Sequence, residues 1–191
     1  MTLSDLAPAD RHRAAAAGFT AVAARVPDWD APAPVAGWAA RDVVGHLVEW
    51  LPGFLAGGGV ALPPGPDVAA DPLHAWQQRA DAVQTLLDDP TMAEQPFEHP
   101  RVPPQSLAET IGAFYTADVF MHTWDLARAA GSDVELDPEF CEQLYQGMLP
   151  IEQLLRDSGQ YGPAVPVPDE ADPQTRLVAF IGRDPAWRPP D

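Results

Sequence analysis

The sequence predicts an all-α fold, and three observations lead to that prediction. Apolar residues recur at spacings of three and four along several long segments, as they do on one face of a helix. Three Asp-Pro pairs precede such segments, and an aspartate N-cap followed by proline begins a helix well. No run of alternating polar and apolar residues predicts a sheet. We therefore expect a four-helix bundle with a long crossover connection and short extra C-terminal helices.

The first half of the chain contains three predicted helices. The first runs from Pro8 to Val26, is rich in alanine and ends before Pro27. The second runs from Ala39 to Leu55 and the third from Pro72 to Asp88, each with one apolar face. The glycines and prolines of residues 57–66 predict a long loop between the second and third helices.

The fourth helix has the clearest ends. Ser106 and Glu109 form a capping-box pattern at its start, and Gly131 has the position of a C-terminal cap. No residue between them is a helix breaker, so an unbroken helix is expected. Pro90–Pro104 before it is predicted to be irregular, with a short hairpin around Phe97–Val102.

The C-terminal part of the chain predicts two more helices. One runs from Pro138 to Asp157, with a kink at Pro150 because proline cannot donate a helical hydrogen bond. A proline-rich loop then precedes a short helix, Pro173–Ile181. The length of 191 residues suits a single domain, residues 1–191.

Composition excludes several classes of protein. The 11 basic residues, all arginine, and the 28 acidic ones give a net charge of −17, which disfavours binding to nucleic acid or to anionic membranes. No signal peptide or apolar membrane span is evident, so a cytoplasmic location is expected. The single cysteine, Cys141, excludes an internal disulfide and a cysteine-rich zinc module, and we expect it in the core.

Two residues of the fourth helix have the spacing of a metal-ligand pair. Asp118 and His122 are one helical turn apart and share a face with the apolar row Leu107, Ile111 and Phe114, so they are expected to point inward. A buried carboxylate is costly unless a cation or several hydrogen bonds compensate it, and a divalent metal would remove that cost. A pair on the protein surface, or a buried histidine hydrogen-bonded by the aspartate, is the alternative.

A third ligand is needed, and the second helix offers His46. Two imidazoles and one carboxylate leave a coordination position open, which is the pattern of catalytic zinc sites. The same donor set also resembles iron sites with two histidines and one carboxylate, so the metal is not identified by these residues alone. A core histidine satisfied by hydrogen bonds is the alternative interpretation of His46.

The remaining histidines and the tryptophans receive weaker predictions. His12 and His74 fall on polar helical faces and are expected in solvent, whereas His99 lies in a loop and could reach the mouth of a site. Motifs for nucleotide binding or for a serine hydrolase are absent from the sequence. Three tryptophans are expected to be core anchors rather than a ligand cage: Trp38, Trp50 and Trp124.

Two segments resemble known signatures. Residues 37–47, GWAARDVVGHL, resemble the W-[ST]-x-x-[DE]-[VL]-x-x-H-L signature of the DinB-like metal-binding superfamily. Residues 118–131, with the pattern D-x-x-x-H-T-W-D-L-A-R-A-A-G, resemble the second signature of its branch that contains the mycothiol-dependent maleylpyruvate isomerase N-terminal domain. Residues 161–183 are similar to the end of a small-protein subfamily of that branch, so the resemblance covers about Trp38 to Gly182.

The resemblance implies a four-helix bundle with a long crossover and a divalent metal, expected to be Zn²⁺, with Ni²⁺ and Fe²⁺ as alternatives. The ligand positions of the branch fall on His46, Asp118 and His122. Two departures are visible: Ala39 replaces the usual Ser/Thr N-cap, and Asp118 stands where the isomerase has glutamate. The isomerase also has a further C-terminal domain, for which 191 residues leave little room.

The function expected from this resemblance is that of a thiol-dependent transferase or isomerase. Mycothiol or a similar low-molecular-weight thiol would be held as thiolate and would react with a small electrophile. Arg41 and Arg128 are candidates to bind a carboxylate of the thiol or substrate, with a surface role as the alternative. The protein is expected to act as a monomer or a homodimer.

Other assignments remain open at this point. Asp125 could orient a metal ligand from outside the coordination sphere, or it could form an ion pair with Arg128. A non-catalytic module that binds metal and ligand is the second functional hypothesis. A metal-dependent hydrolase is the third, and its general base would be Asp125 or Glu49.

Overall fold

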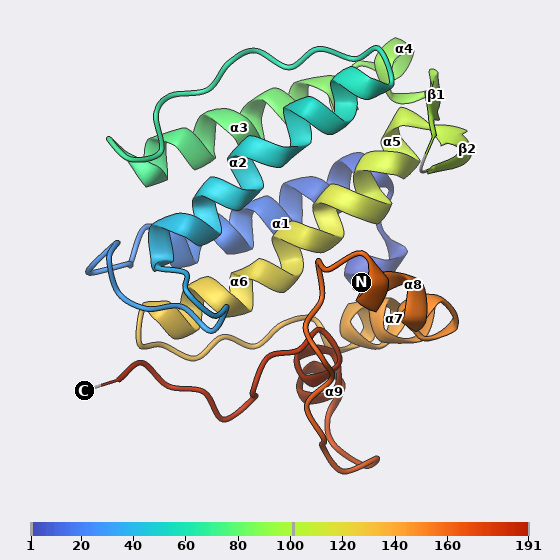
Figure 1. Cartoon of the computed structure of the whole chain (residues 1–191). Helices are drawn as coiled ribbons and strands as arrows, with labels where there is room; N and C mark the ends of the chain where they lie inside the picture. The colour runs from blue at the N-terminus through green and yellow to red at the C-terminus, as the bar shows by residue number, and fades with distance from the viewer. Residues whose placement is uncertain (1, 101, 191) are drawn as a thin grey trace.

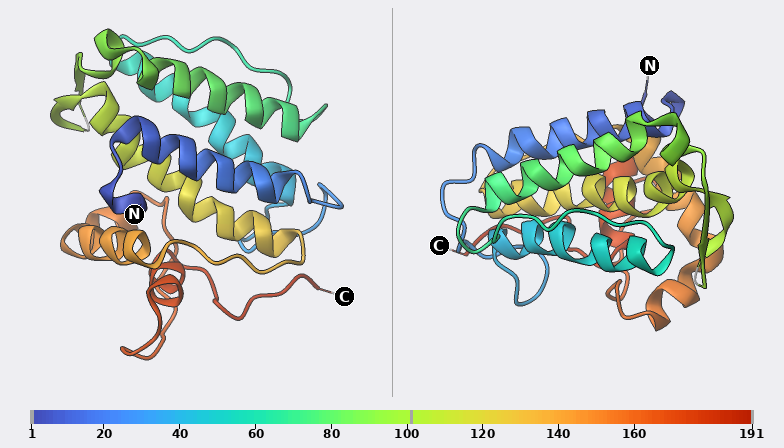
Figure 2. Two further views of the ribbon diagram at one scale, coloured as in Figure 1. Left: turned by 180° about the vertical axis from the view of Figure 1, so that it is seen from behind. Right: turned by 90° about the horizontal axis from the view of Figure 1, so that it is seen from above.

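Four long helical segments surround the main hydrophobic core (Figure 1). The computed structural model describes residues 2–100 and 102–190, so residues 1, 101 and 191 of the predicted domain lie outside the described part. Helix α1 (Pro8–Ala23) packs on α3 (Pro72–Asp88) and on α6 (Ala117–Ala129), and α2 (Ala40–Gly57) packs on the same two helices. The left view of Figure 2 shows α1 lying between α3 and α6, both of which it contacts. The all-α prediction is confirmed.

The first three helices follow the sequence pattern closely. Helix α3 has the predicted ends, with the Asp71 carboxylate accepting from the backbone N–H of His74. Helix α1 stops three residues before the predicted end at Val26, and α2 continues to Gly57 through Pro52. The N–H of Ala39 donates to Asp42 at 2.8 Å, so one half of a capping box survives without a Ser/Thr side chain.

The fourth predicted helix is continuous but contains a π-helical segment. It consists of α5 (Leu107–Thr110), the π segment η2 (Ile111–Thr116) and α6. A π turn holds more residues than an α turn, so the inward face shifts along the sequence. Tyr115 is fully buried, whereas Phe114 is 40% exposed, so the prediction that Phe114 points inward is wrong. The π segment ends directly before the turn that carries Asp118.

A small hairpin interrupts the helices. Strands β1 (Pro96–His99) and β2 (Val102–Ser106) pair antiparallel, which confirms the hairpin predicted there. A short helix that was not predicted, α4 (Pro90–Ala93), precedes it and is capped by Asp89.

The C-terminal helices form a second core against the outer face of α6. They are α7 (Pro138–Met148), the 3₁₀ turn η3 (Leu149–Ile151), α8 (Glu152–Asp157) and α9 (Pro173–Phe180), and the turn at η3 confirms the kink at Pro150. A short 3₁₀ turn, η1 (Leu3–Asp5), contacts α7. Phe120 and Trp124 of α6 pack with Phe140 and the buried Cys141, as expected for that cysteine. Helix α6 is therefore buried on both sides.

None of the helices in the described part of the chain combines the length and apolar composition needed to cross a bilayer.

Candidate metal centre

Helices α2 and α6 bring the three predicted ligands together. His46 projects from α2, while Asp118 and His122 lie one turn apart on α6. The His46 Nε2 atom is 2.9 Å from Asp118 Oδ2, and His122 Nε2 is 3.4 Å from Asp118 Oδ1. One ligand atom from each residue lies within 4.8 Å of the others, so the group could hold a metal ion.

The carboxylate of Asp118 is held in its charged form. The indole N–H of Trp50 donates to Asp118 Oδ2 at 3.0 Å, beside the contact with His46. Burial acts to raise the pKa of Asp118, but the charge of His122 and the hydrogen bonds from His46 and Trp50 outweigh it and lower that pKa. The centre of the group is therefore an anion facing two imidazoles.

The imidazole of His122 is oriented by a second carboxylate. Its Nδ1 lies 2.8 Å from Asp125 Oδ2. Because an ionised carboxylate only accepts hydrogen bonds, Nδ1 carries the hydrogen and Nε2 is turned towards Asp118. Burial acts to lower the pKa of His122, but Asp118 and Asp125 raise it overall. Positive charge on His122 Nε2 is therefore favoured beside Asp118 Oδ1, and either a proton or a bound metal ion would supply it.

The donor set can be compared with that of a zinc site. Ligand atoms at about 2.0–2.1 Å from a tetrahedral zinc ion are roughly 3.3 Å from one another. The 3.4 Å separation of His122 Nε2 is from Asp118 Oδ1 and the 2.9 Å separation of His46 Nε2 is from Asp118 Oδ2, whereas one ligand atom from each residue lies within 4.8 Å of the others, so the side chains would have to close slightly around an ion. Two imidazole nitrogens and one carboxylate oxygen are also ordinary zinc ligands. The shorter arm of aspartate therefore still allows the three groups to converge.

Asp125 has a cationic partner from a distant part of the chain. Its two carboxylate oxygens accept from Arg183 Nε at 3.3 Å and from an Arg183 terminal nitrogen at 3.1 Å. Arg128, the partner considered from the sequence, instead forms an ion pair with Asp133 and lies over the ring of Trp124. Asp125 thus contacts His122, as expected if it orients a metal ligand. Its ion pair is with Arg183 and not with Arg128.

Aromatic rings surround the two histidines. The ring centroid of Trp38 is 5.3 Å from that of His46 and 5.8 Å from that of His122, and it stacks on the latter. The ring centroid of Trp50 is 6.2 Å from that of His46. Trp124 is a core residue as expected, and Trp38 and Trp50 are half-buried residues that pack against the main core and also border the histidines. The spacing of Trp50, one turn after His46, was a sequence signal for this contact.

Solvent reaches the group from the α2 side. The side chain of His46 is 32% exposed and that of Asp118 is 18% exposed, whereas His122 is 6% exposed. The group formed by the described residues contains no fourth protein ligand. A metal ion held by these three residues alone would keep a coordination position for water or a small molecule.

The two arginines proposed to bind a thiol or substrate are held in ion pairs. Arg41 lies 2.7 Å from Asp30 in the loop before α2. Arg128 is held by Asp133, beyond the end of α6. Their role in binding stays a prediction.

The other histidines lie outside the group. His12 is fully buried, bonded to Gln84 at 2.8 Å and stacked near Tyr115, so the prediction of a solvated His12 is wrong. The reason is that α1 packs on both α3 and α6, which covers its polar side. His74 is exposed, as expected.

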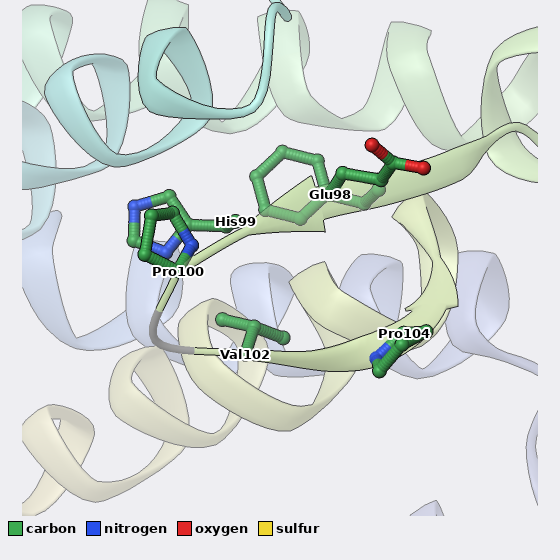
Figure 3. A pocket seen from close by; sticks show the side chains of 6 residues that line it. Glu98, His99, Pro100, Val102 and Pro104 are labelled. Atoms are coloured by element: carbon green, nitrogen blue, oxygen red, sulfur yellow. The ribbon is translucent and has the colours of Figure 1, made fainter.

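His99 lies on the hairpin, against the end of α2. Its ring is 4.8 Å from that of Phe54, and a β-carbon added at Gly57 would lie 3.0 Å from it. Figure 3 shows His99 beside Pro100 and Val102 at a cavity of about 390 Å³. His99 is not part of the group formed by His46, Asp118 and His122.

The sequence reasoning assigned no role to two residues near the centre. Arg183 binds Asp125, and Tyr161 lies close enough for the Asp118 charge to affect it. Burial, with a smaller contribution from Asp118, raises the pKa of Tyr161 to about 12. Both residues belong to the C-terminal stretch that resembles the family, and that resemblance was the signal available for them.

Comparison with known proteins places the chain beside mycobacterial relatives. No protein-family model matches the chain, and no solved structure gives a significant match. The chain is 31% identical over 185 residues to the uncharacterized protein MT0763 of Mycobacterium tuberculosis (strain CDC 1551 / Oshkosh). This alignment covers 92% of the chain and 97% of the relative. The same values hold for the uncharacterized protein Rv0738 of strain ATCC 25618 / H37Rv. At this identity and coverage, the chain belongs to the family of these mycobacterial proteins.

Proposed function

We propose that this protein is a divalent-metal-binding protein that uses a small-molecule thiol to transform a small electrophile, as a transferase or isomerase. The observation that carries the proposal is the convergence of His46 from α2 with Asp118 and His122 from α6. The resemblance of residues 37–47 and 118–131 to the DinB-like signatures supports the same three ligands. Zn²⁺ is the proposed metal because two imidazoles and one carboxylate suit it well.

The packing of the helices supports a DinB-like bundle with a crossover. Helices α1 and α2 each pack on both α3 and α6, so they stand across the bundle from each other. Two helices that follow each other in sequence and lie on a diagonal need a long connection, and residues 24–39 supply it. The site then lies where α2 and α6 meet.

The open side of the group favours a catalytic site over a structural one. Structural zinc sites have four protein ligands, whereas catalytic sites keep one position for water or substrate. A thiol that bound there would be held as its thiolate at neutral pH, because coordination to a metal lowers the pKa of the thiol. Mycothiol is the proposed thiol on the basis of the resemblance, and its product would be a thioether or a double-bond isomer.

The protein's own residues arrange this centre. Trp50 donates to Asp118 Oδ2 and so restricts how that carboxylate rotates. Asp125 accepts from His122 Nδ1 and keeps Nε2 turned towards Asp118. The indole of Trp38 stacks on the His122 ring and lies tilted beside the His46 ring, so it limits water next to His122. A substrate would approach past His46, the most exposed of the three ligands.

The two alternatives have less support. A non-catalytic module would be favoured by a sealed site or a fourth ligand, and the exposed part of His46 argues against a sealed one. A hydrolase needs a general base near the bound water. Asp125 is fully buried and held by His122 and Arg183, and Glu49 is exposed on α2.

The test has a metal arm and a reaction arm. Elemental analysis of the purified chain should find one divalent ion per molecule, and both His46→Ala and His122→Ala should lose it while His74→Ala retains it. The zinc-loaded protein is then incubated with mycothiol and chlorodinitrobenzene, and the conjugate is measured by mass spectrometry. Unchanged metal content in both site variants would refute the ligand assignment. Turnover equal to that of metal-free protein would refute the thiol chemistry alone.

A further inference from the structure

The C-terminal segment contributes a buried charge to the metal centre. Arg183 follows α9, and its side chain is 11% exposed. It donates twice to Asp125, whose side chain is fully buried and also accepts from His122 Nδ1. A single chain of hydrogen bonds thus runs from the end of α9 to a metal-ligand candidate.

The backbone around Arg183 is held by close packing that requires glycine. Gly182 has a φ of +88°, and a β-carbon there would lie 2.8 Å from the Cα of Gly162. The same segment is anchored by Arg156, which donates to the carbonyl oxygens of Gly162 and Phe180. Arg183 also donates to the Ile181 carbonyl at 2.8 Å. The close packing of the backbone at Gly162 and Gly182 therefore holds the guanidinium of Arg183 beside Asp125.

The Asp125 carboxylate depends on this arginine. A buried carboxylate needs charge-assisted hydrogen bonds, and an arginine fork fixes the plane of the carboxylate as well as its charge. Among the described residues, the side chains that bind the Asp125 carboxylate are His122 and Arg183, so without Arg183 the contact with His122 would remain. The direction of the His122 ring, and hence of Nε2, would then be less restricted.

We propose that Arg183 is a positioning residue of the metal centre, and that metal binding and docking of the segment 159–183 stabilise each other. The proposal rests on the metal-binding part of the proposed function and is independent of the thiol. Coupling between two sites is reciprocal. If docking of segment 159–183 increases the affinity for metal, bound metal must stabilise the docked segment by the same free energy.

The test begins with zinc affinity. Full-length wild type and Arg183→Ala are titrated with Zn²⁺ against a chromophoric chelator, and circular dichroism verifies that each is folded. We expect Arg183→Ala to bind about 10- to 100-fold more weakly, as for removal of other groups that orient a metal ligand. Arg176→Ala is the matched control, because Arg176 is on α9 and pairs with Glu142 rather than with Asp125. The control should bind as wild type does.

Two further measurements separate positioning from general stability. In an Asp125→Asn background, Arg183→Ala should cause little additional loss of zinc affinity, because the arginine acts through that carboxylate. In wild type, Zn²⁺ should slow amide hydrogen exchange in residues 177–183, and in Arg183→Ala it should not. If Arg183→Ala does not fold, Arg183→Lys replaces it and should still weaken zinc binding, since an ammonium cannot make the paired contact.

Each outcome decides the proposal. The proposal is overturned if a folded Arg183 variant binds zinc as tightly as wild type does. It is also overturned if the losses of zinc affinity caused by Arg183→Ala and Asp125→Asn add fully, or if zinc leaves amide exchange in residues 177–183 unchanged. Failure of wild type to bind zinc would instead refute the metal centre itself, so the two failures are distinguishable. If zinc binding and docking of segment 159–183 are coupled but no thiol conjugate forms, only the proposed thiol chemistry is refuted.

Discussion

The indole N–H of Trp50 donates to Asp118 Oδ2, the same carboxylate oxygen that faces His46 Nε2. Trp50 and His46 are one turn apart on α2, so one helix supplies both a metal-ligand candidate and the donor that steadies the shared carboxylate on α6. This arrangement requires α2 and α6 to keep a defined distance and rotation. Substitution of the residues that form these contacts can therefore test the metal centre and its packing.

Replacing Trp50 by phenylalanine should weaken metal binding without unfolding the protein. Phenylalanine keeps an aromatic ring at this half-buried position but cannot donate the hydrogen bond to Asp118, and loss of such a bond to a metal ligand costs about 10-fold or more in affinity. Zinc titration against a chelator measures the change. Trp76→Phe is the control, because it removes an indole bond to Thr20 at 2.8 Å elsewhere in the bundle. A greater loss of zinc affinity in the control would contradict the role of Trp50.

Substituting Asp118 should abolish the stabilisation by metal. A ligand that binds only the folded state raises stability in proportion to the logarithm of its concentration over its dissociation constant. Zinc at 100 times that constant should therefore add about 2.7 kcal/mol to wild type and nothing measurable to Asp118→Asn. Thermal melts with and without zinc measure this. The exposed Asp81→Asn serves as control, and an equal zinc-dependent rise of Tm in Asp118→Asn would disprove the assignment.

The buried His12 should make stability depend on pH. Burial lowers the pKa of His12 below 6.5, although the hydrogen bond with Gln84 partly opposes it. The unfolded chain therefore binds a proton that the folded protein does not, so this contribution to stability is present above about pH 6.5 and is lost as pH falls. Urea unfolding at pH 7.5 and about pH 5 should show a smaller loss on acidification in His12→Gln than in wild type.

The comparison needs a histidine that stays in water. His74 is exposed on α3, so His74→Gln should lose stability on acidification as wild type does. If His12→Gln and wild type lose the same free energy of unfolding over this pH range, the buried and neutral state of His12 is not the cause.

Gly182 should tolerate alanine poorly. Its φ of +88° costs a side-chain-bearing residue about 1–2 kcal/mol, and the added carbon would also approach Gly162 within 2.8 Å. Gly159→Ala is the matched control, because Gly159 also has a positive φ, +73°, but no atom lies within 4 Å of the added carbon. Urea unfolding should find Gly182→Ala clearly less stable than Gly159→Ala. Equal stabilities would show that the backbone crossing does not restrict this position.

Much of the fold could be predicted because its signals are local. The Asp-Pro caps mark the starts of α3, α7 and α9, and Pro150 marks the turn between α7 and α8. The π segment was missed because no breaker residue signals it. Glycine and the β-branched and aromatic residues of Ile111–Thr116 lower the helix propensity, but they do not distinguish a π turn from an α turn, and the effect is visible in the exposure of Phe114 and the burial of Tyr115.

By itself, the sequence determined that the chain is helical and acidic, where most helices begin, and that Asp118 and His122 share a helical face. These properties depend on composition and on contacts within about one helical turn. Only the tertiary structure decided that His46 faces Asp118 across two helices, that Trp38 and Trp50 border the histidines, and that Arg183 reaches Asp125. Those relationships join residues far apart in the chain, and their geometry is set by how α2, α6 and the C-terminal segment pack together.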